Sequence, residues 1–494
     1  RTLSRAVMKP IVHEIPWTES PDFYAGQLAG EAGVVLLRSG LVDGDRGRYS
    51  LLAANPFLRF RSTRTRIEMA TDEGAQVVFG NPWEVLDRLM SRYELLDEID
   101  LPFPLGGCFG FWGYDLKHFV EPSVPRNTLN DLELPDCELG FYDGLVVFDH
   151  QLQKVWIVST GMLPDGSRSA KVAERRLHEW LGVLGEEDSR ELGSSSTGDK
   201  MPAVRAWSNF SRDGFVSAVR RAKEYIRQGD IYQVNLAQRL CVPTEGSGWD
   251  LFERLHAVSP APYSAYFDFG HWQLVSSSPE LFLRMNGQAM RTRPIKGTRP
   301  RSSDPVRDAQ FTYELQTSAK EMAELVMITD LLRNDLGRVC EFGSVQVPDL
   351  VKLEKYPQVQ HLVSTVDGRL RPELTHTDAL SQCFPGGSIT GAPKVRAMQI
   401  IDELEPVTRG PYTGCHGYLG FNRESMVSIS IRTAVVQPTL TSFHAGAGIV
   451  ADSDPEMEYE ETIAKARGFL QAIELAGDGI KIDVRVPSIG TVAD

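Results

Sequence analysis

The sequence predicts an α+β fold in which β-sheets pack on one another and helices lie among them. Short strand-like runs cluster along the chain, and amphipathic helices interrupt them at irregular intervals, unlike a regular βαβ repeat. The chain has 494 residues, 42% hydrophobic and 24% charged, close to the averages of globular proteins. Disordered, collagen-like and disulfide-stapled classes are therefore excluded.

The first part of the chain is predicted to mix strands and helices. Its strand-like runs are 33–38, 142–148 and 154–158, and its helical stretches are 83–93 and 170–184. A polar, Gly/Ser-rich segment follows at 185–202, and its composition cannot bury a core. We predict a linker or exposed loop there, between an N-terminal region (1–184) and a C-terminal region (203–476), which is followed by a tail (477–494).

Helices and strands alternate irregularly in the second part. Ser211 is a predicted helix cap, with Phe210 and Phe215 as a hydrophobic staple and Gly229 as the end. Ser318 is predicted to cap a long helix from about Ala319 to Asp335, with Gly337 as its stop signal. The other predicted elements are strands at 263–269, 273–277, 281–285, 414–421 and 426–436, a helix after Pro393, and a last helix opening at Asp454 and Pro455.

Composition also limits the compartment and the partners. The net charge of −14 argues against non-specific binding of nucleic acid, and no apolar run reaches the length of a membrane span. Six cysteines lie far apart without a CxxC pair, which disfavours zinc and indicates a reducing compartment. Residues 1–13 lack the apolar core of a secretory signal, with Met8 as a candidate start. We expect a cytoplasmic protein.

Two pairs of carboxylates have helical spacing. Glu321 and Glu324 lie on the helix after Ser318, and Glu458 and Glu461 on the last helix, each pair at i,i+3. If the two faces meet, four carboxylates surround one point and suit Mg²⁺. The alternatives are a capping box at Ser318 and Glu321, and an i,i+4 ion pair between Glu461 and Lys465.

Two glycine-rich segments and one arginine are candidate anion sites. Residues 384–394 form a glycine-rich turn before a helix, and 446–448 (Gly-Ala-Gly) form a second turn whose N–H groups could hold an anion. Strand alternation places Ser428, Ser430 and Arg432 on one face, which is either a solvated face or a pocket wall with Arg432 gripping a carboxylate. Both segments can also be plain turns.

Cys108 lies in a GxCxG sequence that matches a glutaminase nucleophile elbow. A cysteine nucleophile needs a placed base, and nothing downstream resembles the His-Pro-Glu signature of those enzymes. We interpret Cys108 as a small packed residue.

Taken together, the segments from about 215 to 473 resemble the chorismate-utilising enzymes, which include anthranilate, aminodeoxychorismate, isochorismate and salicylate synthases. The segments that carry the resemblance are 232–236 (Tyr-Gln-Val-Asn-Leu), 278–280 (Ser-Pro-Glu), 321–337, 361–364 (His-Leu-Val-Ser), 384–394, 446–448 and the last glutamate pair. The N-terminal part is similar more weakly, through 36–39 and 113–115. The resemblance implies one α+β body of two packed sheets flanked by helices, in which both chain halves contribute strands.

Lys296 points to one branch of this family. It lies in Pro-Ile-Lys-Gly-Thr, as in aminodeoxychorismate synthases, where anthranilate synthases usually have alanine. The resemblance implies conversion of chorismate and ammonia to 4-amino-4-deoxychorismate, for p-aminobenzoate and folate synthesis. Lys296, as a free amine, would attack C2 and expel the C4 hydroxyl, and ammonia would then replace the lysine.

The resemblance also implies the other site residues. Glu280 would be the general acid/base, and His361 would lie near the ring carboxylate. Mg²⁺ would be held by Glu324 and Glu461 directly, and by Glu321 and Glu458 through water. The substrate would contact Gly297, Thr298, Tyr412, Arg432, Gly446, Ala447 and Gly448.

A second pocket and a partner follow from the same resemblance. The family's N-terminal pocket can bind tryptophan, and the corresponding residues here are Ser39, Arg48, Tyr49, Ser50, Pro262, Tyr263 and Ser264. No glutaminase module fits in the chain, so the resemblance implies a separate amidotransferase subunit that supplies ammonia from glutamine.

Two alternative functions remain for this chain. Anthranilate synthase component I uses the same pocket but aminates C2 and releases pyruvate, and the Lys296 amine would occupy that approach to C2. The rival of another class is a non-catalytic subunit that senses chorismate or tryptophan, against which the intact set of Lys296, Glu280 and four glutamates argues.

Overall fold

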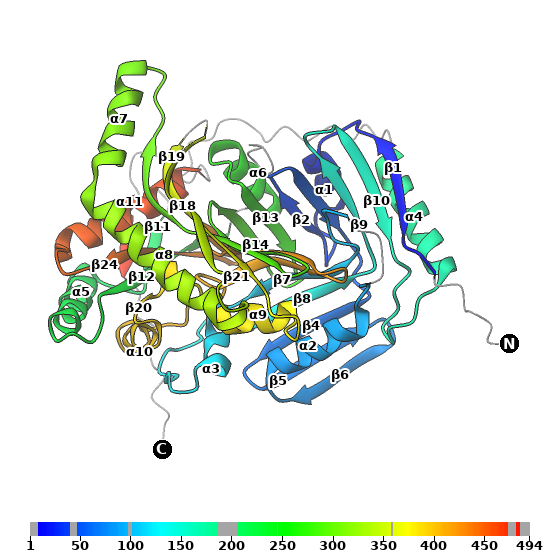
Figure 1. The fold of residues 1–494 in the computed structure, drawn as a ribbon, viewed down its shortest axis with the longest axis horizontal. Coiled ribbons are helices and arrows are strands. Elements are labelled where there is room, and N and C mark those ends of the chain that lie inside the picture. Colours follow the sequence, from blue (N-terminus) through cyan, green and yellow to red (C-terminus); the bar gives the residue numbers. More distant parts are fainter. Residues whose placement is uncertain are drawn as a thin grey trace.

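Two large β-sheets form the body of the molecule, with helices around them (Figure 1). The computed structural model describes residues 8–39, 47–96, 101–185, 205–244, 246–356, 359–472 and 481–484. The predicted segment 185–202 lies outside these residues except for Gly185. The α+β prediction is confirmed.

The first sheet has 13 strands among the described residues, and all but one of its pairings are antiparallel. In pairing order its strands are β1 (Ile11–Pro16), β10 (Lys154–Ser159), β9 (Gly144–Asp149), β3 (Tyr49–Ala53), β2 (Val35–Arg38), β13 (Tyr263–Asp268), β14 (Gln273–Ser278), β23 (Thr433–Val436), β24 (Leu440–Ile449), β12 (Gln233–Pro243), β11 (Arg205–Ser208) and β25 (Lys481–Val484), with β20 (Gly391–Ala392) joined to β12. The parallel pair is β11 and β25, so a strand lies within the predicted tail.

The second sheet has 12 strands in the described part of the chain. They are β17 (Ile295–Pro300), β19 (Val359–Arg369), β16 (Ala289–Arg293), β15 (Leu281–Asn286), β22 (Glu424–Ile429), β21 (Cys415–Gly420), β7 (Gly107–Trp112), β8 (Cys137–Tyr142), β4 (Leu58–Thr63), β5 (Arg66–Thr71) and β6 (Gly74–Phe79), with β18 (Gln346–Lys355) joined to β19. β2 pairs with β13 in the first sheet, and β7 with β21 in the second. Both halves of the chain therefore build both sheets, as expected.

Eleven α-helices lie among the described residues; six of them begin close to predicted residues, and five (21–28, 117–120, 248–258, 305–317 and 376–383) were not predicted. The eleven are α1 (Pro21–Leu28), α2 (Pro82–Tyr93), α3 (Lys117–Val120), α4 (Ala170–Gly185), α5 (Arg212–Arg227), α6 (Gly248–Val258), α7 (Pro305–Thr317), α8 (Ala319–Val339), α9 (His376–Cys383), α10 (Lys394–Leu404) and α11 (Pro455–Ala472). The prediction that Gly337 ends its helix is wrong, because α8 continues to Val339. Leu336 and Val339 are buried there, and this packing outweighs the roughly 1 kcal/mol helix penalty of glycine.

The predicted strand 426–436 is also wrong as a single element. β22 ends at Ile429 in the second sheet and β23 begins at Thr433 in the first, with Arg432 between them at a φ of 50°. The chain thus crosses from one sheet to the other, and alternation along one strand does not place Arg432. The run 142–148 is likewise divided, since Tyr142 ends β8 and Gly144 begins β9.

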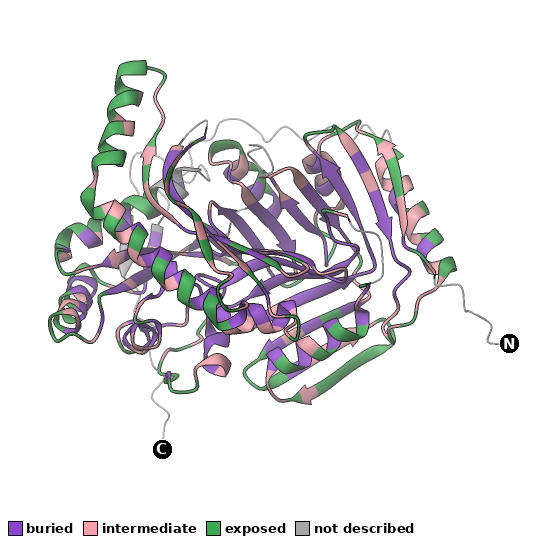
Figure 2. Ribbon diagram, in the orientation of Figure 1, coloured by how far each residue is buried: buried purple, intermediate pink, exposed green. Residues whose placement is uncertain are grey.

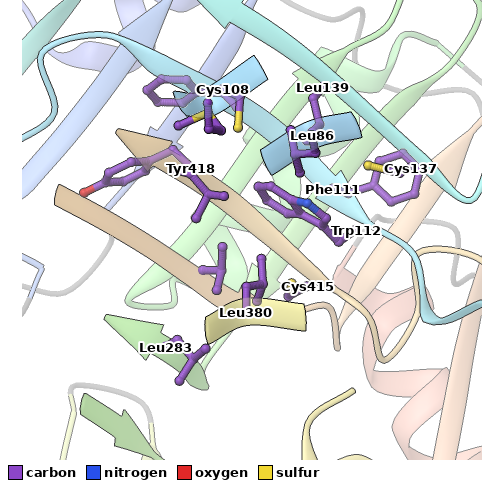
Figure 3. Packing of buried hydrophobic residues seen from close by; sticks show 14 of the residues in the cluster. Leu86, Cys108, Phe111, Trp112, Cys137, Leu139, Leu283, Leu380, Cys415 and Tyr418 are labelled. Atoms are coloured by element: carbon purple, nitrogen blue, oxygen red, sulfur yellow. The ribbon is translucent and has the colours of Figure 1, made fainter. Parts of the chain in front are cut away.

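The main core lies between the two sheets, where the strands are mostly buried (Figure 2). Phe111 of β7 packs edge-on against Phe269 and Trp272, with ring centroids 5.7 and 5.3 Å apart. Cys108 and Cys137 lie in the same apolar cluster (Figure 3). Burial raises the pKa of the Cys108 thiol to about 12, so this cysteine is packed and unreactive, as the sequence predicts.

None of the described helices is long and apolar enough to cross a membrane.

Candidate active site

A cavity of about 1130 Å³ collects most of the predicted site residues. Its wall includes Glu280, Lys296, Gly297, Thr298, Glu321, Glu324, His361, Tyr412, Arg432, Gly446, Gly448 and Glu461. Two predicted residues do not line it. Ala447 of β24 is fully buried in an apolar cluster, and Glu458 is only 4% exposed.

Lys296 projects from β17 toward two acids and one strand. Its Nζ lies 4.0 Å from the place that a Cβ on Gly448 would occupy. Its charge lowers the pKa values of Glu280 and Glu324, partly opposing the effect of burial on both carboxyls. The amine therefore faces the cavity between Glu280, Glu324 and the end of β24.

Glu280 is a buried carboxyl with one strong hydrogen bond. The Ser388 hydroxyl donates to Glu280 Oε1 at 2.6 Å, and the residue is 5% exposed. Burial raises the pKa of Glu280 to about 7, while Ser388 and Lys296 lower it. A carboxyl with this pKa can give and take a proton near neutral pH.

Replacing Ser388 with alanine is expected to raise the pKa of Glu280 and to slow turnover about tenfold, because the carboxyl loses a hydrogen bond that orients it and favours its charged form. The pH dependence of kcat/KM measures the shift, which moves the limb controlled by Glu280 to higher pH. An unchanged limb would contradict this coupling, and Ser388→Thr, which keeps the hydroxyl, is the control.

His361 and Arg432 supply different kinds of contact. His361 lies on β19, with its Nδ1 2.9 Å from Thr298 Oγ1. Burial, assisted by Arg432, lowers the pKa of His361 to about 4, so the ring is neutral at pH 7. Arg432 has no ion pair with any described residue and is accessible from the cavity, so its guanidinium is free to grip an anion.

Tyr412 and β24 form the opposite wall. A Cβ on Gly446 would lie 2.6 Å from Tyr412 Oη, so only glycine leaves room for this hydroxyl. The predicted turn 446–448 is wrong, because these residues lie within β24 and pair with β12. β23 pairs only with Thr441, Ser442 and Phe443, so the edge of β24 beyond them is open toward the cavity. Peptide N–H groups on that edge can hold a carboxylate.

The four predicted carboxylates come from α8 and α11, as expected. Burial raises the pKa of Glu324, and the charges of Glu461 and Glu321 raise it further. Ser318 caps α8 by accepting from the Glu321 N–H, but the Glu321 side chain binds Arg299. Glu461 forms the i,i+4 ion pair with Lys465.

This donor set fits magnesium in its chemistry, since every donor is a carboxylate oxygen. Among the described residues, no three acidic, histidine or cysteine side chains yet surround one point as a formed metal centre. Two of the carboxylates would have to leave their basic partners to do so.

Sequence reasoning missed several residues of the cavity wall. They are Asn235, Arg299, Lys320, Ser388, His444 and Lys465. His444 stacks on Tyr412 with ring centroids 4.8 Å apart, and nothing in the sequence around this histidine indicated the contact. Ser388 could have been found as the one hydroxyl within the short helical turn Gly387–Ile389.

A second, smaller cavity of about 60 Å³ lies between the sheets at the predicted tryptophan pocket. Six of the seven predicted residues line it: Ser39, Arg48, Tyr49, Pro262, Tyr263 and Ser264. Ser50 is instead buried against His150, at 2.6 Å. A cavity that binds benzene, a molecule smaller than tryptophan, has a volume of about 150 Å³. Tryptophan binding therefore stays a prediction, and it requires the walls of this cavity to move apart.

A large cavity that gathers acids, lysines and an arginine without an ion pair to any described residue is typical of an enzyme that acts on a small anion. Residues 40–471 match the family model of the chorismate binding enzyme. The chain is 38% identical to aminodeoxychorismate synthase component 1 of Escherichia coli, over 94% of this chain and 99% of the relative. It is 41% identical to anthranilate synthase component 1 of Thermus thermophilus, over 92% and 95%.

Solved structures agree with the sequence relatives. Anthranilate synthase component I from Streptococcus pneumoniae aligns with a TM-score of 0.76 and 31% identity, covering 92% of this chain and 98% of that one. The chain belongs to the family of chorismate-binding enzymes. Within this family its curated relatives include both aminodeoxychorismate and anthranilate synthases.

Proposed function

We propose that this chain is the synthase subunit of an aminodeoxychorismate synthase, which converts chorismate and ammonia to 4-amino-4-deoxychorismate and water for p-aminobenzoate and folate synthesis. The position of Lys296 carries the proposal, because its amine faces the cavity beside an acid, Glu280, that holds a proton near neutral pH. An amine and a proton donor are the two groups that displacement of an allylic hydroxyl requires.

The proposed reaction has two displacements. The Lys296 amine bonds to C2 of the ring, the double bond shifts, and the C4–O bond breaks as Glu280 gives its proton to the departing hydroxide. Ammonia then bonds to C4, the double bond shifts back, and the C2–N bond to Lys296 breaks. Glu280 takes up the proton that the incoming nitrogen loses, which restores the acid for the next turnover.

Binding of the dianion is proposed to use separate groups for its two carboxylates. Arg432, Tyr412 and the open edge of β24 would hold the enolpyruvyl carboxylate. The neutral His361, positioned by Thr298, would donate a hydrogen bond to the ring carboxylate. Glu324 and Glu461, with Glu321 and Glu458 behind them, would hold Mg²⁺, which supplies positive charge next to that carboxylate.

Ammonia is proposed to come from a separate glutamine amidotransferase subunit. We expect the purified chain to consume chorismate with an ammonium salt but not with glutamine, and glutamine to become a substrate only when the partner subunit is added. Chorismate consumption, followed by absorbance, measures this. Sustained turnover by the purified chain with glutamine alone would contradict it.

Anthranilate synthesis is the second candidate, since several relatives carry that name. The two reactions differ in pyruvate, which anthranilate synthesis releases and amination at C4 does not. A lactate dehydrogenase assay during turnover with ammonium is expected to detect no pyruvate. Pyruvate in proportion to the chorismate consumed would replace this proposal with the second candidate.

A further inference from the structure

Two basic side chains hold two of the four carboxylates. Arg299 of β17 binds Glu321 through two guanidinium nitrogens, at 3.0 and 3.3 Å. Lys465 lies 2.7 Å from Glu461 and also donates to the Gly446 carbonyl at 2.8 Å. The side chains of the first pair are 28% and 22% exposed, and those of the second 52% and 50%. Because solvent weakens exposed pairs, Arg299–Glu321 is the stronger.

Glu321 is held close to the strand that carries Lys296 and Arg299. Gly297 has a φ of +71°, and a Cβ there would lie 3.1 Å from Glu321 Cδ and 2.6 Å from Leu315 Cδ1. Glycine therefore gives the Glu321 carboxylate its place against β17. From this place the carboxylate can face either Arg299 or the cavity.

Arg299 has a second carboxylate within reach. Glu314 Oε2 lies 3.9 Å from Arg299 Nε. Glu314 belongs to α7, the helix that projects from the body and is largely exposed (Figures 1 and 2). Arg299 can therefore leave Glu321 and still keep a negatively charged partner.

The charge balance of the cavity gives a reason for such a movement. Its lining includes five cationic side chains (Lys296, Arg299, Lys320, Arg432 and Lys465) and four carboxylates (Glu280, Glu321, Glu324 and Glu461), a formal sum of 5 − 4 = +1. A divalent cation alone would raise this sum to +3, so it must compete with cations already bound to its donors.

We propose that Arg299 is an exchangeable counter-cation and a positioning residue. Its guanidinium pairs with the Glu321 carboxylate in the metal-free protein and moves to Glu314 when a divalent cation binds. This inference rests on the proposed use of the glutamates of α8 and α11 for Mg²⁺. It assigns Glu314, outside the cavity lining, a part in metal binding that its position on α7 would not otherwise indicate.

Mn²⁺ binding to the full chain, measured by titration calorimetry and by the loss of the free Mn²⁺ electron paramagnetic resonance signal, tests the exchange without any turnover. Arg299→Gln is expected to bind Mn²⁺ about three- to tenfold more tightly than the unchanged chain, because Glu321 is released. Glu314→Gln is expected to bind it more weakly, because Arg299 loses its alternative partner.

Two controls separate exchange from a general effect of charge. Lys320 lines the same cavity but forms no ion pair with a described residue. We therefore expect Lys320→Gln to increase Mn²⁺ affinity less than Arg299→Gln does. In a Glu321→Gln background, Arg299→Gln is expected to change Mn²⁺ affinity less than about twofold. Circular dichroism confirms that each variant is folded.

The proposed exchange would be overturned if Lys320→Gln increased Mn²⁺ affinity as much as Arg299→Gln does. It would also be overturned if Arg299→Gln still increased Mn²⁺ affinity in the Glu321→Gln background. Mn²⁺ binding that does not respond to Arg299→Gln would overturn it too, and would leave the proposed metal role standing. No Mn²⁺ binding by any of the chains would overturn both.

Discussion

Replacing Lys296 with alanine is expected to lower kcat for chorismate amination by about 10³-fold or more, because the first displacement loses its nucleophile. Chorismate affinity should change less than about tenfold, since Arg432 and the edge of β24 are intact. Turnover with ammonium and calorimetric titration with chorismate measure the two effects separately.

Lys320 offers a matched control, since it is a second lysine in the wall of the same cavity but lies on α8. Lys320→Ala is expected to lower kcat by less than about tenfold, because no covalent role is assigned to it. Mass spectrometry gives a second readout. Without ammonia, the unchanged chain is expected to gain the mass of chorismate less one water on the peptide that contains Lys296, and Lys296→Ala to gain none. Full amination activity in Lys296→Ala would remove the basis of the proposed mechanism.

Replacing Glu280 with glutamine is expected to lower kcat by about 10²- to 10⁴-fold, the usual contribution of a general acid. The amide is similar in size and can still accept from Ser388, so the wall keeps its shape. What is lost is the proton that the departing hydroxide needs.

The same prediction fixes the direction in which kcat/KM changes with pH. Because the pKa of Glu280 is raised to about 7, its acid form prevails below that pH and is lost above it. At a constant concentration of free ammonia, kcat/KM of the unchanged chain is expected to fall as pH rises through about 7, and Glu280→Gln to lack this limb. A limb that survives in Glu280→Gln would assign the titration to another group.

The sequence predicts the local elements better than the path of the chain between them. Ser211 caps α5 by accepting from the Gly214 N–H, and Phe210 packs on Phe215 at 5.5 Å, because capping and stapling depend on neighbouring residues. Gly337 and Arg432 were misplaced because long-range packing decides them. One lies in a helix whose buried face continues, and the other lies where the chain changes sheets.

In the candidate site, too, local spacing could be predicted but long-range contacts could not. The glutamates of α8 and α11 could be paired by their spacing, and the family resemblance supplied Lys296 and Glu280. The i,i+4 pair of Lys465 with Glu461 could also be predicted from spacing, whereas Arg299 and Ser388 could not be assigned partners from the sequence. Whether Glu321 completes a capping box or binds Arg299 depends on a strand that approaches α8 from outside the helix. Sequence spacing reports which residues share a face, but not what faces them.

The position of the new nitrogen tests the central claim most directly. The purified chain would be incubated with chorismate, Mg²⁺ and ¹⁵N-ammonium, and the product examined by nuclear magnetic resonance. The account predicts ¹⁵N bonded to C4 of a ring that keeps its enolpyruvyl group. A nitrogen on C2 of an aromatic ring, with one pyruvate released for each product, would contradict it and place the chain among the enzymes that make anthranilate.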